Sequence, residues 1–390
     1  MARRILLVAG LWALLHVYVG TRLLAPAGIA PLWEGAGWIV VLLLAFAPFA
    51  AFSVRRMASL PAKPVLERMG FGAMGLSSLL IVLVLAGDLT HLRTWLGAGP
   101  FSAGALSGSL LLLVIGAWHA RRPSLVRIDV PIDELPADLE GFRIVQLSDL
   151  HVGGDLKRDF VERVVTRANE LQPDVIALTG DVGDGFPADL RHDLAPLAQL
   201  AAQHGKFFVT GNHEYYWDGP GWVSEIERLG FDPLVNAHRV IRRGSGALVL
   251  AGVTDFSAGH AVPGHRSDPG AAVAGAPADG VRVLLAHQPK SAFAARREGF
   301  DLQLSGHTHG GQYFPFNLLV RLFQPFVAGL HRLEKMWLYV SRGTGYWGPP
   351  LRLGAPSEIT LIRLVGAPAV APVRPPLEPN HDSDISLQSH

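Results

Sequence analysis

The 390-residue sequence contains no cysteine, which excludes both a disulfide framework and a thiolate metal site. Any metal ion that the chain binds must therefore be held by nitrogen and oxygen ligands. Acidic residues are scarce in residues 1–120, which carry eight lysines and arginines against three aspartates and glutamates, whereas residues 121–390 carry the remaining 26 and 30. The overall charge of +1 hides this split, and the sequence predicts two regions of different kinds.

Four apolar stretches fill the first region, each close to the length that an α-helix needs to cross about 30 Å of hydrocarbon. A cleaved signal peptide would account for the first stretch but not for the other three. We therefore predict a transmembrane region over residues 1–122, with helices at about 5–24, 38–54, 69–89 and 101–119. A transporter with a regulatory domain is disfavoured, because charged residues are nearly absent from the spans.

Basic residues flank these stretches unevenly. Two of the connecting loops balance one arginine with one acid, Arg22 with Glu34 and Arg93 with Asp88, while the other flanks are strongly basic. The positive-inside rule then places both termini and the second region on the cytoplasmic side. The cations on that side are Arg3, Arg4, Arg55, Arg56, Lys63, Arg68, Arg121 and Arg122.

Residues 123–365 alternate short apolar runs with amphipathic segments, which is typical of an α/β domain. Strands are expected at 125–132, 142–147, 175–178 and 207–209, and helices at 156–171 and 188–204. Helical signals become scarce after Leu234, where further runs predict strands of a second sheet. These runs are 240–241, 248–253, 281–285, 302–304, 337–340 and 359–364.

Two segments have the composition of irregular structure. Residues 261–280 are dominated by alanine, glycine and proline and are expected to form a loop, with His260 and His265 solvated. Residues 366–390 contain five prolines and lack apolar periodicity, which predicts a disordered tail.

Five apolar runs each end in a polar turn that contains metal-ligand residues. Because the loops at the carboxyl ends of strands converge in open α/β sheets, we expect these turns to meet at one site. The candidate ligands are Asp149, His151, Asp181, Asn212, His287, His307 and His309. Seven ligands exceed the four of one tetrahedral ion, so two divalent ions bridged by one carboxylate fit better. Manganese, iron, zinc and nickel all suit this donor set.

Two cations about 3.5–4 Å apart can hold a hydroxide between them and neutralise a phosphoryl group during in-line displacement. The candidate set therefore predicts hydrolysis of a phosphoester. A single Asp-x-His or His-x-His pair is more often a surface pair, and the prediction depends on the ordered set of five turns. The alternative from another class is a membrane-anchored sensor or scaffold with a structural metal site.

In the blocks SDLH, TGD, GNHE and GHTHGGQ, the sequence resembles the bacterial membrane-associated branch of the calcineurin-like metallophosphoesterases, over roughly residues 125–365. The resemblance implies a four-layer α-β-β-α sandwich and a location in the bacterial inner membrane. It also implies that one metal is bound by Asp149, His151 and His309, the other by Asn212, His287 and His307, and both by Asp181.

The same resemblance makes His213 the proton donor to the leaving group and Asp184 the carboxylate that orients it. An imidazolium held by a carboxylate is a competent general acid. Glu214 directly follows His213 and is the alternative orienting group. The His213–Asp184 pair disfavours the scaffold interpretation, because a structural metal site has no use for a proton donor.

The net charge of −4 over residues 121–390 disfavours nucleic acid as a partner. The apolar segment 313–326 follows the last metal-binding turn and fits either a buried cap or a lip that faces lipid. With the membrane tether, this motivates the hypothesis that the substrate is a lipid-linked phosphodiester or pyrophosphate at the cytoplasmic leaflet. Some relatives in this branch are pyrophosphatases acting on UDP-diacylglucosamine. The sequence does not specify an oligomeric state.

Overall fold

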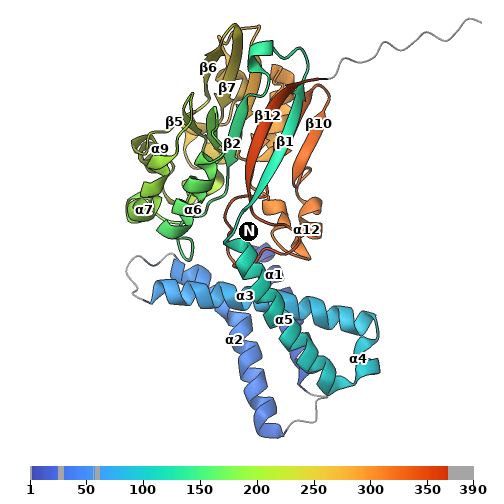
Figure 1. Cartoon of the computed structure of the whole chain (residues 1–390). Coiled ribbons are helices and arrows are strands. Elements are labelled where there is room, and N and C mark those ends of the chain that lie inside the picture. Colours follow the sequence, from blue (N-terminus) through green and yellow to red (C-terminus); the bar gives the residue numbers. More distant parts are fainter. Residues whose placement is uncertain (1, 25–29, 56, 58–61, 368–390) are drawn as a thin grey trace, which may run out of the picture.

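The computed structural model describes residues 2–24, 30–55, 57 and 62–367, so the predicted tail lies almost wholly outside the described residues. Four long apolar helices lie together at one end of a two-sheet domain (Figure 1). They are α1 (Ala2–Leu23), α2 (Pro31–Arg55), α3 (Lys63–Leu89) and α5 (Ala98–Ala120), with the short α4 (Leu92–Leu96) between the last two. Each of the four is long and apolar enough to cross a membrane, which confirms the predicted helical region.

The helices extend past the apolar runs that predicted them; α3, for example, begins at Lys63 and continues through Glu67 and Arg68 before its apolar run. Helix α2 begins at Pro31 and α3 has Pro64 in its first turn, where the missing N–H of proline costs nothing. Inside the bundle, His16 pairs through Nε2 with Ser77 Oγ at 3.0 Å and through Nδ1 with the Trp12 carbonyl at 2.9 Å.

Two six-stranded sheets form the second region. The first has the order β1 (Ser124–Ile132), β12 (Glu358–Gly366), β2 (Arg143–Leu147), β3 (Val175–Leu178), β4 (Lys206–Phe208) and β5 (Asp232–Pro233). The second has the order β10 (Gly329–Leu333), β11 (Met336–Val340), β9 (Leu302–Ser305), β8 (Val281–Leu285), β7 (Gly246–Gly252) and β6 (Ala237–Arg243). Strands β2, β3 and β4 are parallel to one another, as are β7, β8 and β9.

Three apolar cores separate four layers. The central core packs the two sheets against each other, for example Ile144 and Val175 of the first sheet with Leu250 and Val283 of the second. The outer face of the first sheet is covered by α6 (Arg158–Asn169), α7 (Pro187–Leu194) and α9 (Gly219–Arg228), and that of the second by α10 (Pro269–Val273) and α11 (Ala292–Ala295). The α-β-β-α sandwich implied by the resemblance is confirmed.

Some elements differ from the sequence prediction. The last strand, β12, joins the first sheet, parallel to β1 and antiparallel to β2, and not the second. The helix expected at 188–204 ends at Leu194 and continues only as a 3₁₀ turn, because Pro196 cannot donate the backbone hydrogen bond. The expected loop 261–280 contains α10, whose Ala272 is buried. In the same loop the ring of His265 bonds the Tyr215 hydroxyl at 2.8 Å, so this histidine is not simply solvated.

Candidate active site

The predicted ligands lie on turns that follow the parallel strands of both sheets. Asp149 and His151 follow β2, Asp181 follows β3, and Asn212 opens the short helix α8 (Asn212–Trp217) after β4. From the second sheet, His287 follows β8, and His307 and His309 follow β9. The carboxyl ends of parallel strands share one edge of a sheet, so the two edges bring all seven side chains to one end of the sandwich.

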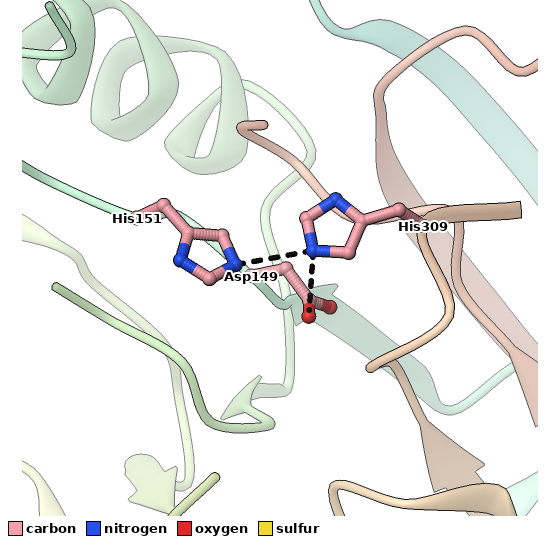
Figure 2. A group of neighbouring side chains, drawn as sticks. All are labelled: Asp149, His151 and His309. Atoms are coloured by element: carbon pink, nitrogen blue, oxygen red, sulfur yellow. Dashed lines mark hydrogen bonds and ion pairs between the residues drawn. The ribbon is translucent and has the colours of Figure 1, made fainter. Parts of the chain in front are cut away.

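Asp149, His151 and His309 form the first group of candidate ligands (Figure 2). The Nε2 atom of His309 lies 3.3 Å from Asp149 Oδ1 and 3.1 Å from His151 Nε2. All three side chains turn their ligand atoms toward one point, although they come from both sheets. This is one of the two ligand sets that the resemblance implied.

The second group forms around His287. Its Nε2 atom lies 3.1 Å from Asp181 Oδ2, 3.2 Å from Asn212 Oδ1 and 3.3 Å from His307 Nδ1. Asp181 Oδ2 is also 3.8 Å from Nε2 of His151 in the first group. This carboxylate therefore lies between the two groups, where a bridging ligand is required.

The chemistry of these groups fits two divalent cations. Several lone-pair atoms point at one another in a buried space, an arrangement that a cation between them would stabilise. Burial lowers the pKa of both His307 and His309 to about 4, which keeps their rings neutral and able to ligate. Burial opposes ionisation of Asp149 and Asp181, but the facing histidines hold the pKa of each carboxyl below its usual range. Both aspartates are therefore charged candidate ligands at neutral pH.

The backbone is strained at the same residues. Left-handed φ angles are uncommon for residues other than glycine and concentrate at functional sites. Five of the seven candidate ligands adopt one, namely Asp149, His151, Asp181, His307 and His309, with φ between 48° and 73°. The strand-end turns thus hold the ligands in conformations that the isolated segments would avoid.

Two glycines make the convergence possible by letting backbones approach the carboxylates. A Cβ atom on Gly211 would lie 2.2 Å from Asp181 Oδ1, and one on Gly306 would lie 2.2 Å from Asp149 Oδ2. Neither distance can be accommodated without displacing a candidate ligand. A side chain in place of the glycine of the GNHE block or of the GHTH block would therefore clash with a candidate ligand.

The structure pairs His213 with Asp184 and gives Glu214 a different task. Nδ1 of His213 donates to Asp184 Oδ1 at 2.6 Å. Buried Glu214 accepts instead from the backbone N–H groups of Asp181, Val182 and Gly211, and its burial raises its pKa to about 7. Burial opposes protonation of His213, but Asp181 and Asp184 raise its pKa to about 9. Its ring is therefore an imidazolium at neutral pH.

Two arginines at the site were not predicted from the sequence. Arg55, counted only as a topological cation, lies with Nη2 2.5 Å from Asp184 Oδ2. Arg352 is fully buried and donates to the carbonyl oxygens of His309 and Arg342, at 2.8 and 2.7 Å. The one sequence feature that could have indicated a buried arginine is the position of Arg352 between two leucines, Leu351 and Leu353. Arg352 fastens the C-terminal turn to the loop that carries His309.

Comparison with known proteins agrees with this geometry. A family model described as calcineurin-like phosphoesterase matches residues 142–311. A "Transmembrane protein with metallophosphoesterase domain" from Danio rerio is 41% identical over 269 residues, covering 67% of this chain and 62% of that protein. An uncharacterized metallophosphoesterase from Aquifex aeolicus is 31% identical over 266 residues, covering 66% of this chain and 98% of that protein.

The chain therefore belongs to the calcineurin-like metallophosphoesterases, a family of metal-dependent phosphoesterases. An uncharacterized metallophosphoesterase from Campylobacter jejuni is a further relative, 39% identical over 249 residues, covering 63% of this chain and 64% of that protein. The chain spans less than two thirds of the length of the relatives from Danio rerio and Campylobacter jejuni.

Proposed function

We propose that the chain is a membrane-anchored phosphoesterase that uses two divalent cations to hydrolyse a phosphodiester or pyrophosphate bond in a lipid-linked substrate. One observation carries the lipid link. A cavity of about 770 Å³ beside His213 and Asp184 is lined on its other side by Phe49, Phe52 and Ser53 of the transmembrane helix α2. Ligand pockets are typically about 300–1,000 Å³, so a substrate in this cavity would contact both the catalytic pair and the membrane span.

In this proposal Asp149, His151 and His309 would hold one cation, Asn212, His287 and His307 would hold the other, and Asp181 would contribute to both. Bound cations would neutralise the phosphoryl charge and lower the pKa of water. The protein's own task is to present these ligands at fixed positions and to keep Asp181 ionised between the two groups. Manganese, iron, zinc and nickel all remain candidates.

The proton step belongs to His213. Its Nδ1–H is held by Asp184, which leaves Nε2 free to donate to the leaving oxygen. Trp347 lies between this ring and the membrane helix, with its ring centroid 5.7 Å from that of His213 and 5.9 Å from that of Phe52. An aromatic wall of this kind excludes water from the leaving group while the proton is transferred.

An apolar groove continues from the cavity into the membrane region. The groove, about 420 Å³ in volume, shares Phe49 and Phe52 with the cavity beside His213. Its other walls come from α1, α3 and the short helix α12 (Phe316–Leu319), including Phe316 and Leu319. We assign the acyl chain of the substrate to this groove and its phosphoryl group to the metal ligands.

The exposure of α12 supports a lip that faces lipid and not a buried cap. Large apolar side chains in segment 313–326 stay exposed, with 74% of Leu322 and 75% of Phe323 accessible. Basic residues of the predicted cytoplasmic flanks pair with the catalytic half, Arg55 with Asp184 and Arg68 with Asp155. These pairs favour a catalytic half at the cytoplasmic face of the bacterial inner membrane.

The test is hydrolysis by the full-length protein in detergent micelles, stripped of metal and reconstituted with manganese, zinc, nickel or iron. We expect turnover of a lipid-linked pyrophosphate that requires the metal and is lost in Asp181→Ala, with about two ions bound per chain. Faster turnover of bis(p-nitrophenyl) phosphate than of any lipid-linked substrate would overturn the lipid assignment alone. Turnover of neither compound with any metal would overturn the phosphoesterase proposal.

A further inference from the structure

Arg55, the last residue of the transmembrane helix α2, reaches the catalytic pair. Its Nη2 atom lies 2.5 Å from Asp184 Oδ2, and the two side chains are only 14% and 4% exposed. The guanidinium also lies over the ring of Phe71 on α3, at 5.7 Å from the ring centroid. The end of one span and the flank of another therefore fix this cation beside a carboxylate of the catalytic half.

Asp184 serves two histidines as well as this arginine. Its Oδ1 atom accepts from His213 Nδ1 at 2.6 Å, while Oδ2 faces Arg55 and lies 3.2 Å from His151 Nδ1. One rotation of the carboxylate would therefore disturb both the proton donor and a candidate metal ligand. The contact of Oδ2 with the guanidinium is charge-assisted, as is that of Oδ1 with the His213 imidazolium, so Arg55 adds a second restraint against such a rotation.

The arginine also offsets the cost of burying the carboxylate. An ionised carboxyl group removed from water is strongly destabilised unless a partner charge lies beside it. Asp184 is only 4% exposed, and Arg55 Nη2, at 2.5 Å from Oδ2, supplies such a partner charge. The position of Arg55 at the C-terminus of α2 favours a cation there independently.

The other basic residues that cross from the membrane region to the catalytic half have a different partner. Arg68 of α3 and Arg121, just after α5, both pair with Asp155, at 2.5 and 3.1 Å. Within the part of the chain that the structure describes, the Asp155 carboxylate interacts with Arg68, Arg121 and the Tyr346 hydroxyl and with neither His213 nor His151, and the side chain of Arg68 is 63% exposed. These pairs attach the catalytic half to the spans, and they provide matched controls for Arg55.

We propose that Arg55 is a positioning residue contributed by the membrane region, which holds Asp184 so that Asp184 keeps the His213 ring aligned with the leaving group. It acts through the general acid and does not itself contact the reacting atoms. The inference needs phosphoester hydrolysis at this site but not a lipid-linked substrate, so soluble diesters can test it.

The experiment compares full-length Arg55→Met, Arg55→Lys and Arg68→Met in detergent micelles. Substrates are bis(p-nitrophenyl) phosphate and diphenyl phosphate, whose phenolate is the poorer leaving group. Because a general acid contributes about 10²–10⁴-fold, we expect Arg55→Met to lower kcat by about 10- to 100-fold with little change in KM. The loss should be larger for diphenyl phosphate, and Arg55→Lys should restore part of the rate. Arg68→Met should stay within about threefold of the wild type, as a surface pair contributes little.

A double-variant cycle separates positioning from docking. In an Asp184→Asn background, Arg55→Met should cost little further rate, because the two changes remove one contact. Equal losses from Arg55→Met and Arg68→Met, or additive losses with Asp184→Asn, would overturn the proposal. If Arg55→Met gives too little folded protein, the rates of Arg55→Lys, alone and combined with Asp184→Asn, are compared in its place.

A second readout does not depend on turnover. The short bond from His213 to Asp184 should give a downfield imidazole N–H resonance in protein labelled with ¹⁵N-histidine. We expect this resonance to shift or vanish in Arg55→Met and to remain in Arg68→Met. An unchanged resonance in Arg55→Met would refute the positioning role even in a protein that hydrolyses neither diester, which would separately refute the proposed function.

Discussion

His213 and Asp184 meet from different turns, and their bond of 2.6 Å is the feature that separates an enzyme from a metal-binding scaffold. We expect His213→Asn to lower kcat by about 10²–10⁴-fold while about two metal ions remain bound per chain. Steady-state kinetics and elemental analysis of the same sample measure both quantities. A variant that lost its metal together with its activity would contradict this separation and favour the scaffold interpretation.

Loss of the proton from His213 is expected to reduce the rate of hydrolysis at alkaline pH. Asp181 and Asp184 raise its pKa to about 9, and a proton donor, the role proposed for His213, is active only while protonated. We therefore expect kcat to fall as pH rises through about 9. Asp184→Asn removes one negative charge beside His213 and should lower the pKa of His213. The alkaline fall in kcat should therefore move toward lower pH. Rate profiles between about pH 6 and 11 measure the shift, and a limb that stays in place would exclude His213 as its source.

For single residues, the sequence predicted which side chains gather at the site better than it predicted what each side chain does there. The seven ligand candidates were found because each stands at the end of an apolar run, where loops of an α/β sheet converge. Sequence spacing could not decide between Asp184 and Glu214 as the orienting carboxylate. The answer depends on the groups that each carboxylate meets in the fold, which are the His213 ring for Asp184 and backbone N–H groups for Glu214. The contact of Arg55 with Asp184 depends on how α2 packs against the catalytic half, and no local sequence pattern encodes that packing.

At the scale of elements, the strand-end turns leave no spare volume around the candidate metal ligands Asp181 and Asp149. A Cβ atom at Gly211 would lie 2.2 Å from Asp181 Oδ1. We expect Gly211→Ala to destabilise the fold by about 1–3 kcal/mol, as overpacking does, and to reduce the bound metal. Gly264, which has no atom within 4 Å of its added Cβ, is the matched control.

Urea unfolding and metal analysis should leave Gly264→Ala within about 0.5 kcal/mol of the wild type, as for most surface changes. If Gly211→Ala had the same stability and the same metal content as the wild type, the turn would be able to move away from Asp181, and the prediction would be wrong.

The lip around α12 makes a second prediction at this scale. Leu322 and Phe323 are highly exposed and follow α12, whose Phe316 and Leu319 line the groove shared with the spans. A charge placed in an acyl environment is costly, so we expect Leu322→Glu with Phe323→Glu to lower kcat/KM for a lipid-linked pyrophosphate by about tenfold or more. Turnover of bis(p-nitrophenyl) phosphate should not change. Val240→Glu on the edge strand β6 is the control, and an equal loss for both substrates would argue for a packing defect.

Sheet membership was the least predictable property of the elements. Runs of apolar residues located most strands to within two residues, but β12 inserts between β1 and β2 although 226 positions separate its first residue, Glu358, from the last residue of β1, Ile132. Such pairing is decided by the whole sheet and not by the segment. The two-residue strand β5 and the polar strand β10 carry too little apolar pattern to be recognised.

For the whole molecule, the orientation in the membrane can be measured directly because the chain has no cysteine. Thr90, between α3 and α4, and Ser224, on α9, are exposed and lie on opposite sides in the proposed topology. We expect a membrane-impermeant maleimide to label Thr90→Cys in intact cells from outside, and to label Ser224→Cys only after lysis. The reverse result would move the catalytic half outward and leave the metal site unaffected.

The contact between Arg55 and Asp184 also bears on how such a protein can evolve. A tether that merely holds an enzyme at a surface is interchangeable, and gene fusion can replace it freely. Here the tether ends inside the catalytic machinery, so a chimera with a foreign anchor would insert and fold yet turn over slowly unless the new helix supplied a cation at the same place. The two halves of this chain are therefore expected to be inherited, and to diverge, as one unit.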